Sequence, residues 1–140
     1  MMDTKVIWEH NLSFSGLNDN ELSLSLKGDT TEENDSEGFI PMELIAIGLA
    51  GCTAMDVISI LLKKRQDVTA FEVQVHADRA TEFPKVFTNI MIEYIVTGHH
   101  VESTAVERSI ELSATKYCPA QAMLSKACKI EQRYTIKDAG

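Results

Sequence analysis

The feature that most constrains the fold is an almost unbroken apolar stretch at residues 39–62 of the 140-residue chain. Such a stretch is about long enough to cross a bilayer as a helix. Glu43 and Asp56 interrupt it, however, and each acid would cost roughly 2.5–3.5 kcal/mol near the bilayer centre. Pro41 fits the first turn of a helix, where its missing N–H is not needed. The sequence therefore predicts a helix from Pro41 to about Lys64, buried at the centre of a soluble domain.

Size and charge restrict the class of protein further. A chain of this length is expected to form one domain, residues 1–140, with a sizeable core. The net charge of −8 disfavours nucleic acid and anionic membrane surfaces as partners. The first residues show no apolar signal segment, and three cysteines are too few for a disulfide framework. These features favour a cytoplasmic location.

The hydrophobic pattern around the helix predicts strands and two shorter helices. Strands are expected before it at 6–8, 14–17 and 21–27, and after it at 71–78 and 86–96, a hairpin that turns near Pro84. Polarity alternates along 21–27 and 71–78, whereas 86–96 is apolar on most of both sides and is expected to be the central strand. An acidic connection fills residues 29–38. Helices at 101–116 and 119–127 and a strand at 128–136 complete the chain. The order β-β-β-α-β-β-α-α-β predicts an α+β fold with a mainly antiparallel sheet.

Cys52 lies on an unusual stripe of the long helix. At 100° per residue it shares one face with Gly48, Asp56, Ser59 and Lys63, whereas most other positions are aliphatic. This stripe of small and polar residues indicates either a functional thiol or a satisfied core cysteine. Both interpretations stay open, because free cysteine is among the most buried residue types.

Cys118 has a clearer local signal. It precedes Pro119, which opens a helix, so Cys118 is the expected N-cap. The free N–H groups at a helix N-terminus stabilise a thiolate and are expected to lower the pKa of Cys118, with Lys116 adding to the effect. A buried cap without reactivity is the alternative. Cys128, at the start of a strand, is interpreted as a small core residue.

Two cysteine motifs resemble those of the OsmC/Ohr superfamily, the osmotically inducible and organic hydroperoxide resistance proteins. PMELIAIGLAGCTAMDVISILLKKRQDV, at 41–68, is similar to the motif of that family's central helix, and KYCPAQAML, at 116–124, is similar to its second-cysteine motif. The hairpin RATEFPKVFTNIMIEYIVTG, at 79–98, looks like that of the YhfA-like branch. The resemblance covers nearly the whole chain.

The resemblance implies an antiparallel sheet around a buried central helix, in an intertwined homodimer. It also implies a thiol peroxidase that needs no metal or organic cofactor. Cys52 would attack an organic hydroperoxide and become a sulfenic acid, and Cys118 would resolve it as a disulfide that an external dithiol reduces. Oxidative stress defence is the role that the family suggests.

Glu43 matches a motif glutamate that, in the family, helps position an activating arginine. It precedes Cys52 by nine residues, roughly 13.5 Å along a helix and on its opposite face. The two side chains cannot touch within one straight helix, so another element or the partner subunit would have to connect them. An acidic residue that only favours the helix dipole is the alternative for Glu43.

The chain departs from the family pattern at the activating arginine, because no arginine precedes Arg65. A thiolate at Cys52 would need another cation, for which Arg79 and Lys27 are the candidates. This departure leaves two alternatives to a peroxidase. One is a protein of the same fold that binds a small ligand without turnover, and the other is a disulfide redox sensor that reacts with thiols but not with peroxides.

Overall fold

The computed structural model describes residues 1–29 and 37–140. The larger part of the acidic connection expected at 29–38 therefore lies outside the described residues. The chain forms two compact units, Met1–Ile45 and Ala46–Gly140, which are described separately below. The predicted order of strands and helices is confirmed, with one additional π-helical turn between the last two helices.

The first unit is a three-stranded antiparallel sheet in the order β1-β2-β3. The strands are β1 (Lys5–His10), β2 (Ser13–Leu17) and β3 (Ser23–Leu26). Asn18 shapes the β2–β3 turn, because its side-chain oxygen accepts hydrogen bonds from the backbone N–H groups of Asn20 and Leu22, both at 3.0 Å. The three strands lie where the hydrophobic pattern predicts them.

The leucine face of β3 differs from its prediction. Alternation predicts Leu22 and Leu24 on a buried face, yet both side chains are exposed. Together with Leu26, Leu17 and Leu44 they line an open apolar hollow of about 380 Å³ in this unit. A three-stranded sheet of this size lacks the residues to cover its own apolar face.

Helix α1 (Pro41–Lys63) begins in the first unit and continues through the second. Its start is stabilised by Glu43, whose carboxylate accepts the Ile40 N–H at 2.7 Å. Its end is marked by Arg65, which adopts the left-handed conformation common at helix C-termini (φ 57°). The helix is long and apolar enough to cross a membrane by composition alone, as the sequence indicated.

Only one face of α1 is buried in the single chain. The buried positions recur every four residues, at Leu49, Thr53, Val57 and Leu61. The opposite side leaves several large apolar side chains exposed, among them Ile47, Met55 and Leu62. The expectation of a helix buried all round is thus met along one stripe only.

The second unit is built on a sheet of three strands in the order β4-β5-β6: β4 (Asp67–Arg79), β5 (Phe87–His99) and β6 (Lys129–Asp138). β4 and β5 form the predicted antiparallel hairpin, with β5 central. The strand pairs of the described residues are mainly antiparallel, as predicted, and β6 is the exception, because it pairs with β5 in parallel. The long helical connection between them returns the chain to the end at which β5 began, and a parallel pair requires such a crossover.

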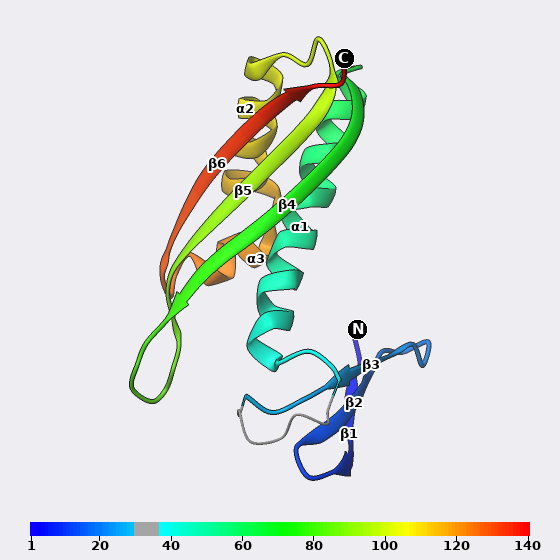
Figure 1. Cartoon of the computed structure of the whole chain (residues 1–140), viewed down its shortest axis with the longest axis vertical. Helices are drawn as coiled ribbons and strands as arrows, with labels where there is room; N and C mark the ends of the chain where they lie inside the picture. The colour runs from blue at the N-terminus through cyan, green and yellow to red at the C-terminus, as the bar shows by residue number, and fades with distance from the viewer. Residues whose placement is uncertain (30–36) are drawn as a thin grey trace. The chain divides into compact units, whose positions relative to one another are not determined.

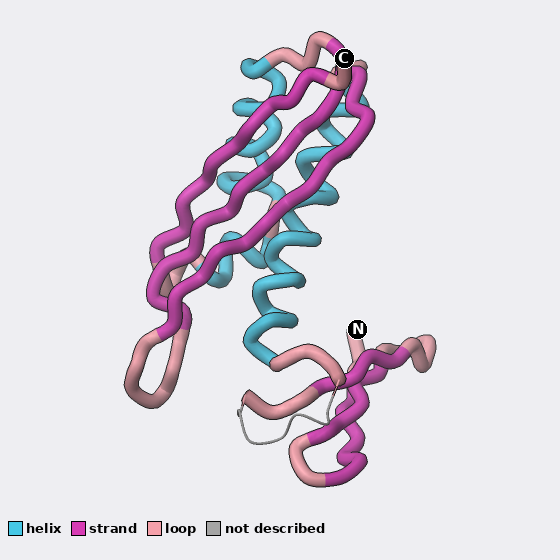
Figure 2. Tube along the Cα trace, viewed as in Figure 1, coloured by secondary structure: helices cyan, strands magenta, loops and turns pink. Residues whose placement is uncertain are grey.

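That crossover contains α2 (Ser103–Leu112), a π-helical turn η1 (Ser113–Tyr117) and α3 (Pro119–Leu124). The helices lie against the same face of the sheet as α1 (Figures 1 and 2). Alternate residues of β5 point into this layer and are almost fully buried: Ile90, Ile92, Tyr94 and Val96. Each such aliphatic side chain contributes about 1.5–3 kcal/mol relative to exposure.

Candidate functional site: a thiol pair on a buried polar network

The two predicted cysteines come together in the second unit. Cys52 lies in the middle of α1 and is partly exposed, whereas Cys118 is only 3% exposed. Cys118 is the N-cap of α3, as predicted, and its sulfur accepts the backbone N–H of Gln121 at 3.3 Å. Cys52 is a neighbour of the Cys118 thiol and one of the groups that raise its pKa. Both cysteines are free thiols here, so the arrangement places one accessible thiol beside one buried thiol.

The predicted lowering of the Cys118 pKa is wrong. Burial of the thiol is the largest influence, and with the neighbouring Cys52 it raises the pKa of Cys118 to about 11. The backbone N–H groups of the α3 N-terminus act in the expected direction, but they do not compensate for the loss of water. Lys116 does not assist, because its ammonium group lies over the ring of Tyr117, 5.2 Å from the centroid.

A prediction follows for thiol labelling. Below its pKa the thiolate fraction of a cysteine rises tenfold per pH unit, so alkylation of Cys118 should increase about tenfold per unit between pH 8 and 10. Iodoacetamide labelling with peptide mapping measures this for each cysteine. Free N-acetylcysteine is the control, and its rate should level off above about pH 8.5. A Cys118 rate that levels off at that same pH would contradict a raised pKa.

Behind the thiol pair lies a closed ring of four hydrogen-bonded side chains, here called the polar ring. Thr53 Oγ1 contacts Tyr94 OH at 2.9 Å, and Tyr94 donates to Gln132 Oε1 at 2.7 Å. Gln132 Nε2 donates to Gln121 Oε1 at 2.8 Å, and Gln121 Nε2 closes the ring on Thr53 Oγ1 at 3.0 Å. The ring joins α1, β5, β6 and α3, so it fixes the helices of the thiol pair to the sheet.

Two further side chains extend from the polar ring and are here called the tail. Ser113 Oγ lies 2.7 Å from Thr53 Oγ1 and 2.9 Å from Asp56 Oδ2. Ser113 is fully buried, and the π-helical turn that begins with it ends at Cys118, whose N–H donates to the Ser113 carbonyl at 2.9 Å. The tail therefore links the turn that ends at Cys118 to Asp56, which lies one helical turn after Cys52.

Burial also dominates the properties of Tyr94. Removal from water raises the pKa of its hydroxyl to about 12, although the hydrogen bonds from Thr53 and Gln121 act in the opposite direction. The phenol is thus neutral under physiological conditions and donates its proton within the ring.

Most of this network was not predicted from the sequence. Asp56 stood out on the polar stripe, but no functional role was expected for Thr53, Tyr94 or Gln121. The available signal was the polar residues Ser113, Gln121 and Gln132 in otherwise apolar positions of their elements. Such residues require hydrogen-bond partners when they are buried.

The remaining predicted site residues lie elsewhere. Glu43 accepts the hydrogen bond at the start of α1, in the first unit, and Lys27 belongs to that unit as well. Arg79 donates through Nε to the Lys85 carbonyl at 2.9 Å, across the end of the β4–β5 hairpin. Cys128 packs against the core, as interpreted from the sequence, and its thiol lies 3.8 Å from the Leu124 carbonyl.

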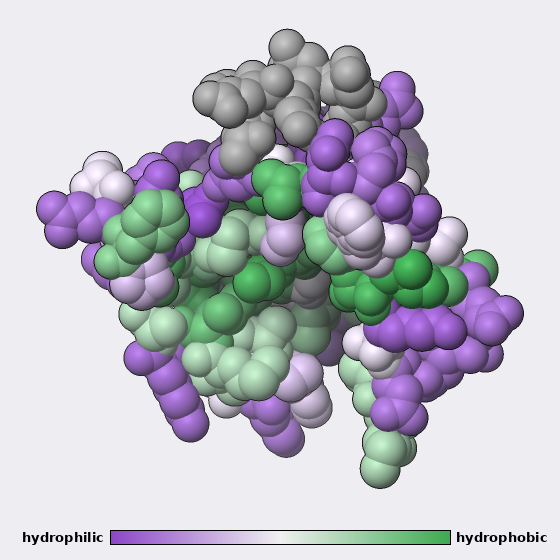
Figure 3. Space-filling model, turned by 90° about the horizontal axis from the view of Figure 1, so that it is seen from below, coloured by the Kyte–Doolittle hydropathy of each residue, from purple (hydrophilic) through white to green (hydrophobic). Residues whose placement is uncertain are grey.

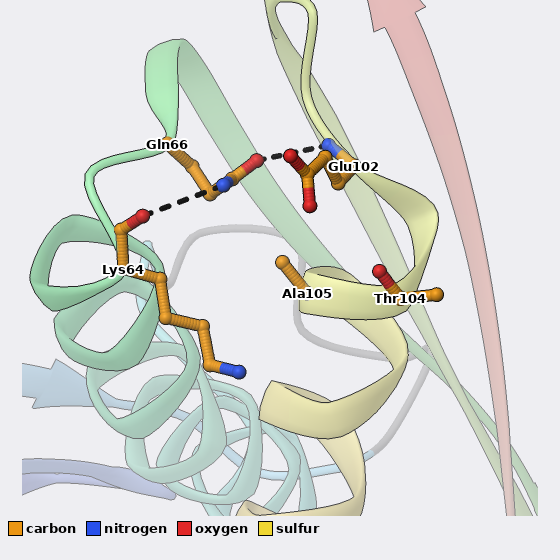
Figure 4. Close-up of a pocket in the computed structure, with 5 residues that line it drawn as sticks. All are labelled: Lys64, Gln66, Glu102, Thr104 and Ala105. Atoms are coloured by element: carbon orange, nitrogen blue, oxygen red, sulfur yellow. Dashed lines mark hydrogen bonds between the residues drawn. The ribbon is translucent and has the colours of Figure 1, made fainter.

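A polar hollow lies where α1 ends and α2 begins, and neither Cys52 nor Cys118 lines it (Figure 4). Its volume is about 380 Å³. Gln66 bridges the two segments, because its amide donates to the Lys64 carbonyl at 3.4 Å and accepts the Glu102 N–H at 2.9 Å. These bonds satisfy backbone groups at the two helix ends, which is a structural task.

Comparison with known proteins gives a consistent result. Residues 32–133 match the family model described as OsmC-like protein. The chain is 38% identical over 135 residues to protein YhfA of Escherichia coli K12, across 96% of this chain and 98% of that protein. These two matches confirm the resemblance to the OsmC/Ohr proteins that the two cysteine motifs indicated.

Solved structures share the fold. An OsmC-like protein from Mycoplasma pneumoniae has a TM-score of 0.84 at 18% identity, over 98% of this chain and 97% of that one. The organic hydroperoxide resistance protein OhrB of Bacillus subtilis has a TM-score of 0.67 at 13% identity, over 96% of this chain and 98% of that one. The fold is thus shared with these structures, and the family match together with the relative at 38% identity establishes that the chain is a member of the OsmC-like protein family.

Proposed function

We propose that this protein is a thiol-dependent peroxidase that reduces organic hydroperoxides and serves in oxidative stress defence in the cytoplasm. The observation that supports the proposal is a partly exposed Cys52 that neighbours the buried Cys118. One thiol is accessible to a substrate, and the other is almost fully shielded from solvent. The name of the structural relative OhrB, an organic hydroperoxide resistance protein, is consistent with this chemistry.

The reaction would proceed in three steps. The Cys52 thiolate attacks the outer oxygen of the hydroperoxide, an S–O bond forms as the O–O bond breaks, and the alcohol leaves after taking up one proton. Cys118 then attacks the sulfur of the Cys52 sulfenic acid, and water leaves with the Cys118 proton as the disulfide forms. An external dithiol supplies two electrons and restores both thiols.

The raised pKa of Cys118 fits a resolving thiol. A thiol with a pKa of about 11 is mostly protonated at neutral pH and is a poor nucleophile toward molecules in solution. The sulfenic acid at Cys52 would form within its reach, where proximity replaces intrinsic reactivity. Glu43, with Arg79 or Lys27 as the cation, remains part of the proposal for thiolate stabilisation.

Steady-state turnover tests the proposal. Reduced protein with dithiothreitol should consume cumene hydroperoxide faster than the dithiol alone does, and hydrogen peroxide more slowly than cumene hydroperoxide. Consumption is followed by a ferrous-xylenol orange assay. Rates equal to those of the dithiol alone for both peroxides would exclude a peroxidase. A disulfide that still forms on addition of oxidised dithiol would then favour the redox sensor.

We also propose that the functional protein is a homodimer. Exposed apolar side chains are numerous on both units, and hydrophobic residues are visible at the surface in Figure 3. In the first unit they include Val6, Trp8 and Leu22, and in the second Met55 and Leu62 on α1. Soluble monomers rarely leave large apolar surfaces uncovered, and a second copy of the chain would cover them.

We expect light scattering coupled to gel filtration to give twice the monomer mass of 15.6 kDa. Replacing exposed apolar residues of α1 with acids, as in Met55→Glu together with Leu62→Glu, should shift the protein toward the monomer, because charges would be buried without partners. An Arg108→Glu variant, at an exposed position of α2, is the control. A monomer of wild-type protein at micromolar concentration would contradict the proposal.

A further inference from the structure

The polar ring and its tail contain six contacts between side chains, and each needs one proton. Four contacts form the ring and two form the tail, at distances of 2.7–3.0 Å. Two oxygen atoms at this separation attract each other only with a proton between them; without it their lone pairs repel. The protons available from each side chain can therefore be counted against the contacts.

The side chains of the ring and the tail hydroxyl supply five protons. Thr53, Ser113 and Tyr94 have one hydroxyl proton each, and each amide of the ring donates into one contact. Turning both amides by 180° does not change this number, because Gln132 then donates to Tyr94 and Gln121 to Gln132. Turning only one amide would set like atoms against each other across their 2.8 Å contact.

The missing sixth proton belongs to the last side chain of the tail. If Asp56 is ionised, Ser113 must donate to it, and one of the two hydroxyl contacts of Thr53 has no proton. If Asp56 is protonated, it donates to Ser113, Ser113 donates to Thr53, and Thr53 donates to Tyr94. Every contact then has one proton.

We propose that Asp56 is a neutral carboxylic acid in the reduced protein and acts as a positioning residue that completes this network. Its role in catalysis rests on the proposed peroxidase function. Asp56 follows Cys52 by one helical turn, a spacing at which Cβ atoms lie about 5–6 Å apart. A neutral carboxyl there holds the Ser113 turn that leads to Cys118, and it places no negative charge beside the Cys52 thiolate.

Infrared spectroscopy tests the protonation directly and does not depend on peroxidase activity. The difference spectrum of reduced wild-type protein minus Asp56→Asn at pH 7 should contain the C=O stretch of a protonated carboxyl. The matched variant Asp78→Asn, at an exposed position of β4, should instead lose a carboxylate band. A carboxylate band in the Asp56 difference spectrum would overturn the proposal.

Alkylation of Cys52 gives a second readout that a merely structural role would not move. The side-chain amide introduced by Asp56→Asn can donate to Ser113 as the protonated acid does, so this variant should alkylate within about twofold of wild type. Removal of an ionised carboxylate at that distance would instead raise the thiolate fraction of Cys52, and with it the alkylation rate, about threefold or more. An acceleration of that size means that Asp56 is charged, whatever the peroxide assays show.

Discussion

Replacement of Cys52 by serine should reduce peroxide consumption by roughly a thousandfold or more, to the rate of the external dithiol alone. The sulfur of Cys52 is the atom that is oxidised in the proposed reaction, and no other described thiol is accessible beside a partner in the same way. A hydroxyl in its place is far less nucleophilic and is not deprotonated at neutral pH. Peroxide consumption by the purified variant, under the turnover conditions above, measures the loss.

The companion variants make this result specific. Cys118→Ser should still react once with peroxide and should retain a sulfenic acid at Cys52, which dimedone traps and mass spectrometry locates. Cys128→Ser is the matched control, because Cys128 packs against the core without a thiol partner, and it should keep most of the activity. Full activity in Cys52→Ser, or dimedone addition at another cysteine, would contradict the assigned roles.

Replacement of Thr53 by valine should lower the free energy of unfolding by about 3 kcal/mol. Thr53 Oγ1 is the point at which the polar ring and the tail meet, in contact with Tyr94, Ser113 and Gln121. Valine has nearly the same shape but removes all three hydrogen bonds, so that the Gln121 Nε2 donor and one bonding position each of Tyr94 and Ser113 are left unsatisfied. Each unsatisfied buried group costs about 1–3 kcal/mol. Urea unfolding followed by circular dichroism measures the change.

Thr135→Val is the matched control, because Thr135 is exposed on β6 and faces away from the network. Its effect should stay within about 0.5 kcal/mol. Equal unfolding midpoints for Thr53→Val and wild type would mean that the ring contributes little to stability. The proposed link between the network and the thiol pair would then lose its basis.

The order of elements could be predicted from the sequence because each signal is local. Alternation marked β4, a shorter apolar run marked β5, Pro41 and Pro119 marked the starts of helices, and the longest apolar run marked α1. The parallel pairing of β6 could not be predicted, because it depends on where the crossover returns the chain. The exposed Leu22 and Leu24 show a second limit of sequence patterns. Alternation identifies the apolar face of a strand, but it does not show whether another part of the protein covers that face.

The two cysteines that the structure brings together could be picked out from the sequence, but the electrostatics around them could not. Local sequence identified Cys118 as an N-cap and thereby suggested an acidified thiol. Local sequence could not reveal that Cys118 is buried in the folded chain. Burial raises the pKa of its thiol by more than the backbone N–H groups of the α3 N-terminus lower it. The polar ring was equally hidden, since it joins residues up to 68 positions apart, as in the bond from Gln121 to Thr53.

The most direct test of the account is oxidation of the reduced protein by one equivalent of cumene hydroperoxide, without any dithiol. Free thiols are counted at intervals, and the disulfide is located by peptide mapping. We predict the rapid loss of two thiols per chain and a disulfide between Cys52 and Cys118, with Cys128 still reduced. Thiols that stay reduced at millimolar peroxide, or a disulfide that includes Cys128, would contradict it.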